Sequence, residues 1–135
     1  MAFSSDIWGE LQMKEFLYKE QSEAIIGAAY EVHRTLGYGF LEKVYQRALK
    51  AELDLRGIAS ELEPQATVFY KDVVVGDYRG DLLVDGKILV EIKVSKEYNP
   101  ADEAQLLNEL KCTRIKVGLL INFGYEGVKF RRMVY

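Results

Sequence analysis

Two acids and a lysine in one short segment are the residues of this sequence that could do chemistry together. Asp81 precedes Glu91 by ten positions, and Lys93 stands two positions after Glu91. Two carboxylates that are brought together repel each other unless a proton or a cation lies between them. A lysine beside them could orient a water molecule or offset the charge that develops on a phosphate under attack. Spacing alone also leaves open an exposed sheet face with a solvated Glu–Lys pair.

The three side chains meet only if the segment forms a hairpin of suitable register around Asp85-Gly86. A two-residue turn would place Asp81 on an aliphatic face, and burying an unpaired carboxylate costs several kcal/mol. A three-residue connection such as 84–86, with Gly86 left-handed, shifts the pairing by one residue and moves every side chain to the other face. One face then carries Leu82, Val84, Ile88, Val90, Ile92 and Val94, and the other carries Asp81, Leu83, Leu89, Glu91 and Lys93. The sequence therefore predicts the odd-length connection.

The remaining composition narrows the chemistry to hard cations. There is one histidine, His33, and one cysteine, Cys112, so the chain cannot supply a zinc site of the usual Cys/His kind. A metal would be Mg²⁺, Mn²⁺ or Ca²⁺ bound by carboxylate and carbonyl oxygens. The Ile92 carbonyl could add such an oxygen if the edge of its strand is open. His33 lies within a helical pattern, and we expect it to be structural and to bond a nearby carbonyl.

Charge and length set further limits. The 135 residues suffice for one domain, and a formal net charge of −3 argues against nucleic-acid binding through a broad basic surface. Two local basic clusters, at 111–116 and 129–132, could still form a phosphate-facing rim. The lone cysteine fits a reducing compartment, so we expect a cytoplasmic protein. No export signal and no apolar stretch of about 18 residues appears, so we expect no membrane association.

Periodic patterns predict the elements that must position these residues. Helical spacing runs from Gln21 to Leu36 and again from about Phe40 to Arg56, and each helix is followed by a glycine. Strand patterns cover 66–70 and 73–75, then 78–84 and 87–94 as the hairpin. A third helix is expected over 101–112, and strands over 115–122 and 128–134. Residues 1–17 form a weakly organised extension, so a single α/β (α+β) domain is expected over 18–135.

A second motif makes the pattern more specific. The segment Gly39-Phe40-Leu41-Glu42-Lys43-Val44-Tyr45 resembles the signature of the GxxExxY protein family. That family is a branch of the PD-(D/E)xK, or restriction-endonuclease-like, nuclease superfamily, whose D…ExK motif is similar to Asp81 and Glu91-Ile92-Lys93. Further similar segments are found at 31–37, 78–84, 104–108 and 117–124. The likeness extends from about residue 18 to the end of the chain.

This resemblance implies a restriction-endonuclease-like core. It consists of two N-terminal helices, a mixed central sheet with an antiparallel three-stranded portion, one further helix and C-terminal strands, with the site at the sheet's edge. Asp81 and Glu91 would be metal ligands and Lys93 the catalytic lysine. Glu42 would hold the metal or its water, although an acid in a first helical turn also interacts favourably with the helix dipole. Gln105 would contact substrate or water, or else be a surface amide. Tyr45 would pack and brace Glu42.

The implied function is a Mg²⁺- or Mn²⁺-dependent nuclease that hydrolyses phosphodiester bonds in nucleic acid, with DNA preferred. A homodimer would allow so small a nuclease to span a duplex. The alternative is a non-catalytic module that keeps the fold and binds nucleic acid or protein. Two departures from the superfamily pattern stand out. Gly80 replaces the proline of the motif, and the third helix carries Asp102, Glu103 and Glu109, which would repel a phosphate backbone.

Overall fold

The computed structural model describes residues 2–135, which fold around a five-stranded mixed sheet. The strands are β1 (Ser60–Leu62), β4 (Leu82–Val84), β5 (Ile88–Lys93), β6 (Val117–Phe123) and β7 (Val128–Val134), in the order β1-β4-β5-β6-β7. β5 and β6 are parallel, and the other neighbours are antiparallel. The expected α+β fold with a mixed sheet is therefore confirmed. Its antiparallel three-stranded portion consists of β1, β4 and β5.

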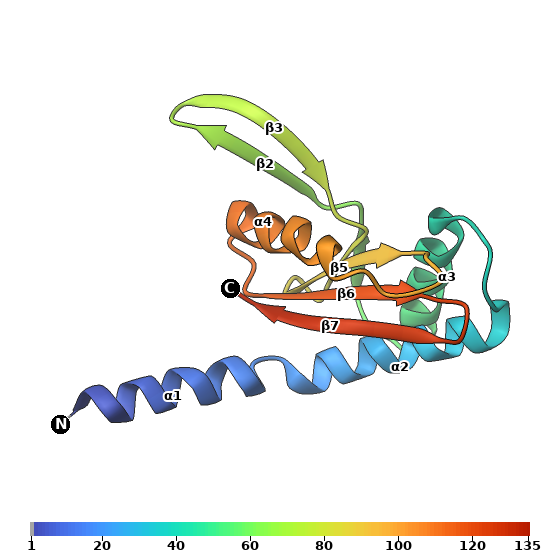
Figure 1. The fold of residues 1–135 in the computed structure, drawn as a ribbon, viewed down its shortest axis with the longest axis horizontal. Coiled ribbons are helices and arrows are strands. Elements are labelled where there is room, and N and C mark those ends of the chain that lie inside the picture. The colour runs from blue at the N-terminus through green and yellow to red at the C-terminus, as the bar shows by residue number, and fades with distance from the viewer. Residues whose placement is uncertain (1) are drawn as a thin grey trace.

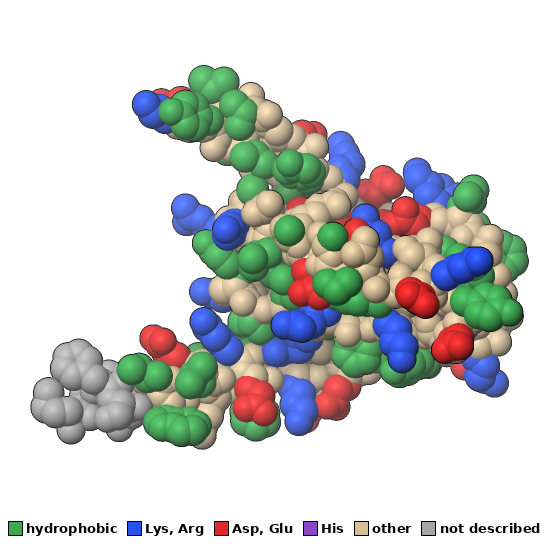
Figure 2. Space-filling model, viewed as in Figure 1, with side chains coloured by type: hydrophobic (Ala, Val, Ile, Leu, Met, Phe, Trp, Pro, Cys, Tyr) green, Lys and Arg blue, Asp and Glu red, His purple; other side chains and the backbone are tan. Residues whose placement is uncertain are grey.

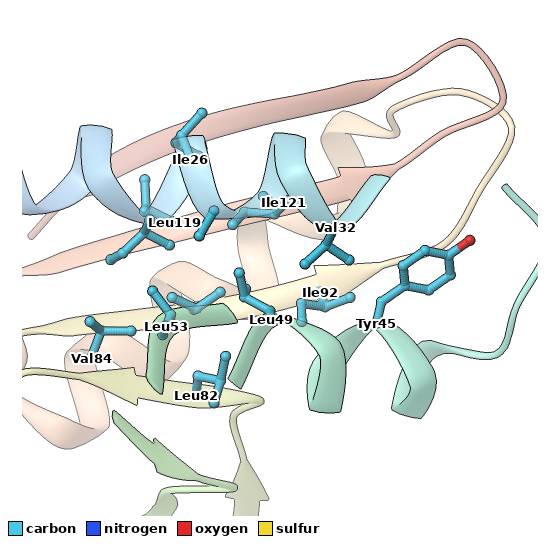
Figure 3. Close-up of a cluster of buried hydrophobic side chains, with 14 of the residues drawn as sticks. Ile26, Val32, Tyr45, Leu49, Leu53, Leu82, Val84, Ile92, Leu119 and Ile121 are labelled. Carbon is cyan, nitrogen blue, oxygen red and sulfur yellow. The ribbon is translucent and has the colours of Figure 1, made fainter. Parts of the chain in front are cut away.

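Two helices cover one face of this sheet. They are α2 (Lys19–Leu36) and α3 (Glu42–Leu55), and α2 ends at Gly37, which has a positive φ of 73° as its terminal position favours. Figure 3 shows side chains of both helices, Val32 and Leu49 among them, directed toward the strands. Burying such a side chain contributes roughly 1.5–3 kcal/mol, so this large apolar cluster is the main core.

A third helix covers the opposite face. The single turn η1 (Pro100–Asp102) leads into α4 (Glu103–Thr113), close to the expected helix. Leu106 and Leu110 of α4 pack on Leu89 and Leu120, which form a second, smaller apolar cluster. β5 therefore has helices over both faces, and its residues are buried almost throughout.

Two further strands form a hairpin of their own. β2 (Gln65–Tyr70) pairs with β3 (Val73–Arg79), and Figure 1 shows this hairpin extending away from the sheet above α4. Several of its large apolar side chains are exposed, among them Phe69, Tyr70 and Val74. The expected break between 66–70 and 73–75 is confirmed, but the break at Gly76-Asp77 is wrong because β3 continues through it, and the expected strand 78–84 is divided after Arg79.

The division occurs at Gly80, where the chain passes from the hairpin into the main sheet. The Gly80 N–H donates to the Pro64 carbonyl at 3.0 Å, and a Cβ at Gly80 would lie 2.8 Å from Leu89 Cδ1. A proline would lose the hydrogen bond and meet the leucine side chain. The structure thus gives a physical reason for the glycine that replaces the proline of the superfamily motif.

The first helix lies outside the layered core. α1 (Ala2–Phe16) extends from the start of α2 (Figure 1), over residues in which the sequence shows only weak periodicity. Several apolar side chains between Ile7 and Phe16 are exposed, including Trp8, Leu11 and Phe16, and Figure 2 shows green side chains along this part of the helix. In the part of the chain that the structure describes, none of the helices combines the length and hydropathy needed to cross a membrane.

Candidate active site

The β4–β5 hairpin brings Asp81 and Glu91 to the same end of the sheet. Leu82 pairs with Val90 and Val84 with Ile88, so the connection is Asp85-Gly86-Lys87. The expectation of an odd-length connection and of its two faces is confirmed. The sequence analysis gave 84–86 as an example of such a connection. The observed pairing is shifted by two residues relative to that example. Continued past Leu82, the pairing places Asp81 directly opposite Glu91.

The sheet opens where these acids lie, because β4 begins only at Leu82. The Asp81 N–H donates to the Val90 carbonyl at 3.1 Å, and Asp81 Oδ2 accepts from the Ile92 N–H at 2.6 Å. In a strand the N–H and C=O of one residue point to the same side, so the Ile92 carbonyl also lies along this open edge. The Asp81 carboxylate thus replaces a backbone carbonyl as the acceptor for the Ile92 N–H. The carboxylates of Asp81 and Glu91 and the Ile92 carbonyl therefore lie at one end of the sheet, where their oxygens could bind a cation.

The acidic face is covered by α4 instead of facing solvent. Glu91 is 4% exposed and Glu109 of α4 is 1% exposed. One carboxylate oxygen of each, Oε2, is buried without a hydrogen-bond donor among the described residues. The reading of this face as a solvated Glu–Lys pair is therefore wrong for Glu91. A buried carboxylate without donors requires a proton or a cation.

The electrostatics agree with this requirement. Burial, with the nearby Glu109 and Asp81 carboxyls, raises the pKa of Glu91 to about 9, and Lys93 opposes the shift. Burial also raises the pKa of Asp81, against the hydrogen bond from Ile92 and the charge of Lys93. The pKa of Glu109 is raised by burial as well, while Gln105 and Glu91 act to lower it. Three acids share one poorly solvated space, and positive charge there would be strongly favoured.

The donor set suits a hard divalent ion that retains water ligands. Asp81, Glu91 and the Ile92 carbonyl supply oxygens only, as Mg²⁺ and Mn²⁺ prefer. Among the side chains that the structure describes, no three from Asp, Glu, His or Cys converge closely enough to form a ready-made metal centre. An ion here would depend on two carboxylates, a backbone carbonyl and water, which is common for Mg²⁺.

Helix α3 contributes two side chains to this edge. Glu42 is the first residue of α3, and partial burial raises its pKa, with Lys93 lowering it and Asp81 and Asp102 adding to the increase. Glu42 therefore lies within electrostatic reach of the other acids. Buried Gln46, one turn later, donates from Nε2 to the Asp81 carbonyl at 3.1 Å. The sequence analysis did not identify Gln46, although its position four residues after Glu42 was a usable signal.

Helix α4 contributes Gln105, which is exposed. Its Nε2 donates to Glu109 Oε1 at 3.2 Å, so the amide contacts an acid one turn later on the same helix. Glu109 is the other residue that the sequence analysis left out of the site. It follows Gln105 by four positions and faces the sheet beside the buried Leu106 and Leu110. An acid at a core-facing helical position is the signal that could have identified it.

Lys93 ends β5 and is half-buried. Its charge affects Asp81, Glu91, Glu109 and Glu42. The close ion pairs recorded for the described residues all involve other lysines and arginines. The ammonium therefore acts on the acids through space, without being held in a tight ion pair.

Two residues of the surrounding frame behave as expected. His33 Nε2 lies 2.8 Å from the Gly124 carbonyl and its ring stacks on Phe123, so His33 is structural. Tyr45 is fully buried against Phe123, and its hydroxyl donates to the Gly37 carbonyl. Tyr45 thereby fixes the loop that precedes Glu42.

An α+β domain with two acids and a lysine at the open end of a central strand has a restriction-endonuclease-like architecture. Residues 19–133 match the PD-(D/E)XK nuclease superfamily, and the chain belongs to that superfamily. Among solved structures, the crystal structure of SSO0001 is similar at 18% identity and a TM-score of 0.55. The match covers 87% of this chain and 59% of that one, and at this identity it shows a shared fold. No curated protein matches this sequence at a significant level.

Proposed function

We propose that this protein is a Mg²⁺- or Mn²⁺-dependent nuclease that hydrolyses phosphodiester bonds in nucleic acid, with DNA as the preferred substrate. One observation carries the proposal. The buried Glu91 carboxyl meets Asp81 beside Lys93 at an open strand end, in a chain of a nuclease superfamily. Three acids held in so little solvent destabilise the fold, and a divalent ion would offset this cost while serving a reaction.

Each residue has a role that follows from its position. Asp81, Glu91 and the Ile92 carbonyl would hold the ion. A bound ion would lower the pKa of an attacking water and neutralise phosphoryl oxygens. Lys93 would donate to the water or to the phosphate, stabilising charge in the transition state. Glu42, which is more exposed at the start of α3, would hold the ion or the water from the open side.

The GxxExxY assignment also has physical support. Gly39 has a φ of 118°, a conformation that side chains rarely adopt. Glu42 follows at the helix start, and Tyr45 anchors the loop through the Gly37 carbonyl. Gly39 and Tyr45 thus fix the loop before α3, and this loop places the Glu42 carboxyl within electrostatic reach of Asp81. We therefore propose that the chain belongs to this branch of the superfamily.

Several expectations remain part of the proposal. Gln105 would contact substrate or water once its bond to Glu109 is exchanged. A homodimer would use the exposed apolar side chains of α1 or of the β2–β3 hairpin. The single cysteine, Cys112, supports a cytoplasmic location.

A non-catalytic module that keeps the fold and binds nucleic acid or protein is the second candidate. One observation favours it. Glu109 adds a further acid beside Glu91, where it would repel a phosphate as well as attract a cation. In that case the acids would no longer serve catalysis, and the exposed apolar side chains of α1 and of the β2–β3 hairpin would contact a partner protein. Metal binding separates the two candidates.

The deciding experiment is a calorimetric titration of Mn²⁺ into the wild type, Asp81→Asn and Asp72→Asn, followed by cleavage assays on DNA and RNA. Asp72 is an exposed acid on the turn of the β2–β3 hairpin and serves as the matched control. The nuclease proposal expects about one or two ions per chain and metal-dependent cleavage, both lost only in Asp81→Asn. A folded wild type that binds no Mn²⁺ would favour the non-catalytic module.

A further inference from the structure

A large hollow lies beyond the end of β5, beside the segment that follows Lys93. Its volume is about 860 Å³, and its walls come from α2, from the segment after β5 and from the turn between β6 and β7. Four aromatic rings and two lysines line it, namely Tyr30, Tyr98, Tyr125, Phe130, Lys96 and Lys129. None of them belongs to the metal-binding set described above.

Hydrogen bonds connect this hollow rigidly to the strand that carries Lys93. Buried Asn122 accepts from the Ser95 N–H and donates to the Ser95 carbonyl, both at 3.0 Å. The Tyr125 N–H donates to the Lys96 carbonyl at 3.2 Å. The wall of the hollow therefore begins within three residues of Lys93 and is fixed to the end of β6.

The rings reach solvent, and contacts orient two of them, Tyr125 and Tyr98. Tyr125 is 68% exposed, and its ring packs edge-to-face on Tyr38 at 5.9 Å. Phe130 is 45% exposed on β7, and the Tyr98 hydroxyl donates to Glu103 at 2.7 Å, which orients the ring. Fixed aromatic rings that solvent can reach are surfaces on which nucleic-acid bases stack.

The charge in the hollow decides which form of nucleic acid suits it. Lys96 and Lys129 are balanced by Glu97 and Glu126 in the same lining, so the formal charges cancel. Duplex binding depends mainly on neutralising phosphates and needs a net positive surface. Stacking of unpaired bases requires open rings and only a few phosphate contacts.

We infer that this hollow binds single-stranded nucleic acid, with bases stacked on Tyr125 and Phe130 and phosphates near Lys96 and Lys129. The inference rests on the proposed function, since it names the strand form of that substrate. A single strand, or the unpaired end of a duplex, would then pass from the hollow to Lys93.

The test is fluorescence anisotropy of a labelled oligothymidylate of roughly ten nucleotides, with the full chain in EDTA so that binding is measured without cleavage. The wild type should bind this strand and bind a duplex of equal length about ten-fold more weakly. Tyr125→Ala and Phe130→Ala should each weaken binding by about ten-fold. Tyr70→Ala, an equally exposed ring on the distant hairpin, should have no effect. Two lysine–phosphate contacts predict a slope of about −1.4 for log affinity against log salt concentration.

Three outcomes would overturn the inference. They are no binding of the single strand, equal binding of the duplex, and ring variants that bind as well as Tyr70→Ala. Circular dichroism of each variant establishes that the fold is retained, which the exposure of both rings favours. Failure of the proposed function would be seen separately, as an absence of Mn²⁺ binding with oligonucleotide binding still lost in the ring variants.

Discussion

Replacing Glu91 with glutamine should stabilise the metal-free protein, although this residue is central to the proposed site. Burial, Glu109 and Asp81 raise the pKa of the Glu91 carboxyl to about 9 from the ordinary 4.5, with only Lys93 opposing them. The folded protein therefore retains a proton that the unfolded chain releases near pH 4.5. Unfolding becomes more favourable as the pH rises above 4.5, because only the unfolded chain releases that proton.

The size of the effect follows from the two pKa values. Between pH 4.5 and about 9 the folded state binds one more proton than the unfolded state. The free energy of unfolding therefore falls by about 1.4 kcal/mol for each pH unit in this window. At pH 7 the accumulated loss is about 3 kcal/mol. Glutamine is uncharged at every pH and similar in shape, so Glu91→Gln should gain up to about 3 kcal/mol at pH 7 and almost nothing near pH 4.5.

Urea unfolding in EDTA from about pH 5 to pH 8 measures this gain. Glu61→Gln, an exposed acid on β1, is the matched control and should follow the wild type. Saturating Mn²⁺ should then raise the free energy of unfolding of the wild type and leave that of Glu91→Gln nearly unchanged. A ligand stabilises only a folded protein that binds it, and Glu91→Gln lacks one of the proposed ligands. The reasoning is refuted if Glu91→Gln is no more stable than the wild type at pH 7, or if its gain does not depend on pH.

Three further predictions follow from individual contacts. Lys93→Ala should lose about two to four orders of magnitude in single-turnover cleavage while calorimetry shows Mn²⁺ affinity within a few-fold of wild type; retained cleavage would remove its assigned role. Gln46→Leu removes one of two donors to the Asp81 carbonyl, which keeps the Glu63 N–H at 3.0 Å, so urea unfolding should show a loss of about 0.5–1.5 kcal/mol and calorimetry weaker Mn²⁺ binding; an unchanged affinity would argue that the residue does not position Asp81. Tyr45→Phe removes the bond to the Gly37 carbonyl and should cost about 1 kcal/mol in the same urea assay, and a neutral result would contradict its anchoring role.

Sequence reasoning could predict the two faces of the β4–β5 hairpin because polarity decides them. Only an odd-length connection keeps the Asp81 side chain off the apolar face that carries the Val90 and Ile92 side chains, and the structure has one. Polarity could not decide which odd-length connection occurs, since registers that differ by two residues expose the same faces. The positive φ values at both Asp85 and Gly86 fix the turn, and neither is visible in a hydrophobic pattern.

The boundaries around Gly80 could not be predicted in the same way. The chain leaves the β2–β3 hairpin there because its N–H bonds to Pro64 and its lack of a side chain admits Leu89. Both partners are distant in the sequence, since Pro64 lies between β1 and β2 and Leu89 lies in β5. The residues on both sides of Gly80 favour strands, so the sequence pattern predicts one continuous strand over 78–84. The contacts of Gly80 with Pro64 and Leu89 divide it into β3 and β4.

The burial of the acidic face was the larger omission, and it changes the chemistry. Taken alone, the hairpin presents Glu91 and Lys93 on a polar face that solvent could cover. Solvent is excluded from that face because α4 packs over it, and the same helix adds the buried Glu109. Core-forming leucines beside the acids are what hold α4 there. A face that is apolar enough to bind a helix and acidic enough to need a cation is unfavourable for stability alone. That conflict, more than the D…ExK spacing, is the physical argument that this strand end serves a reaction.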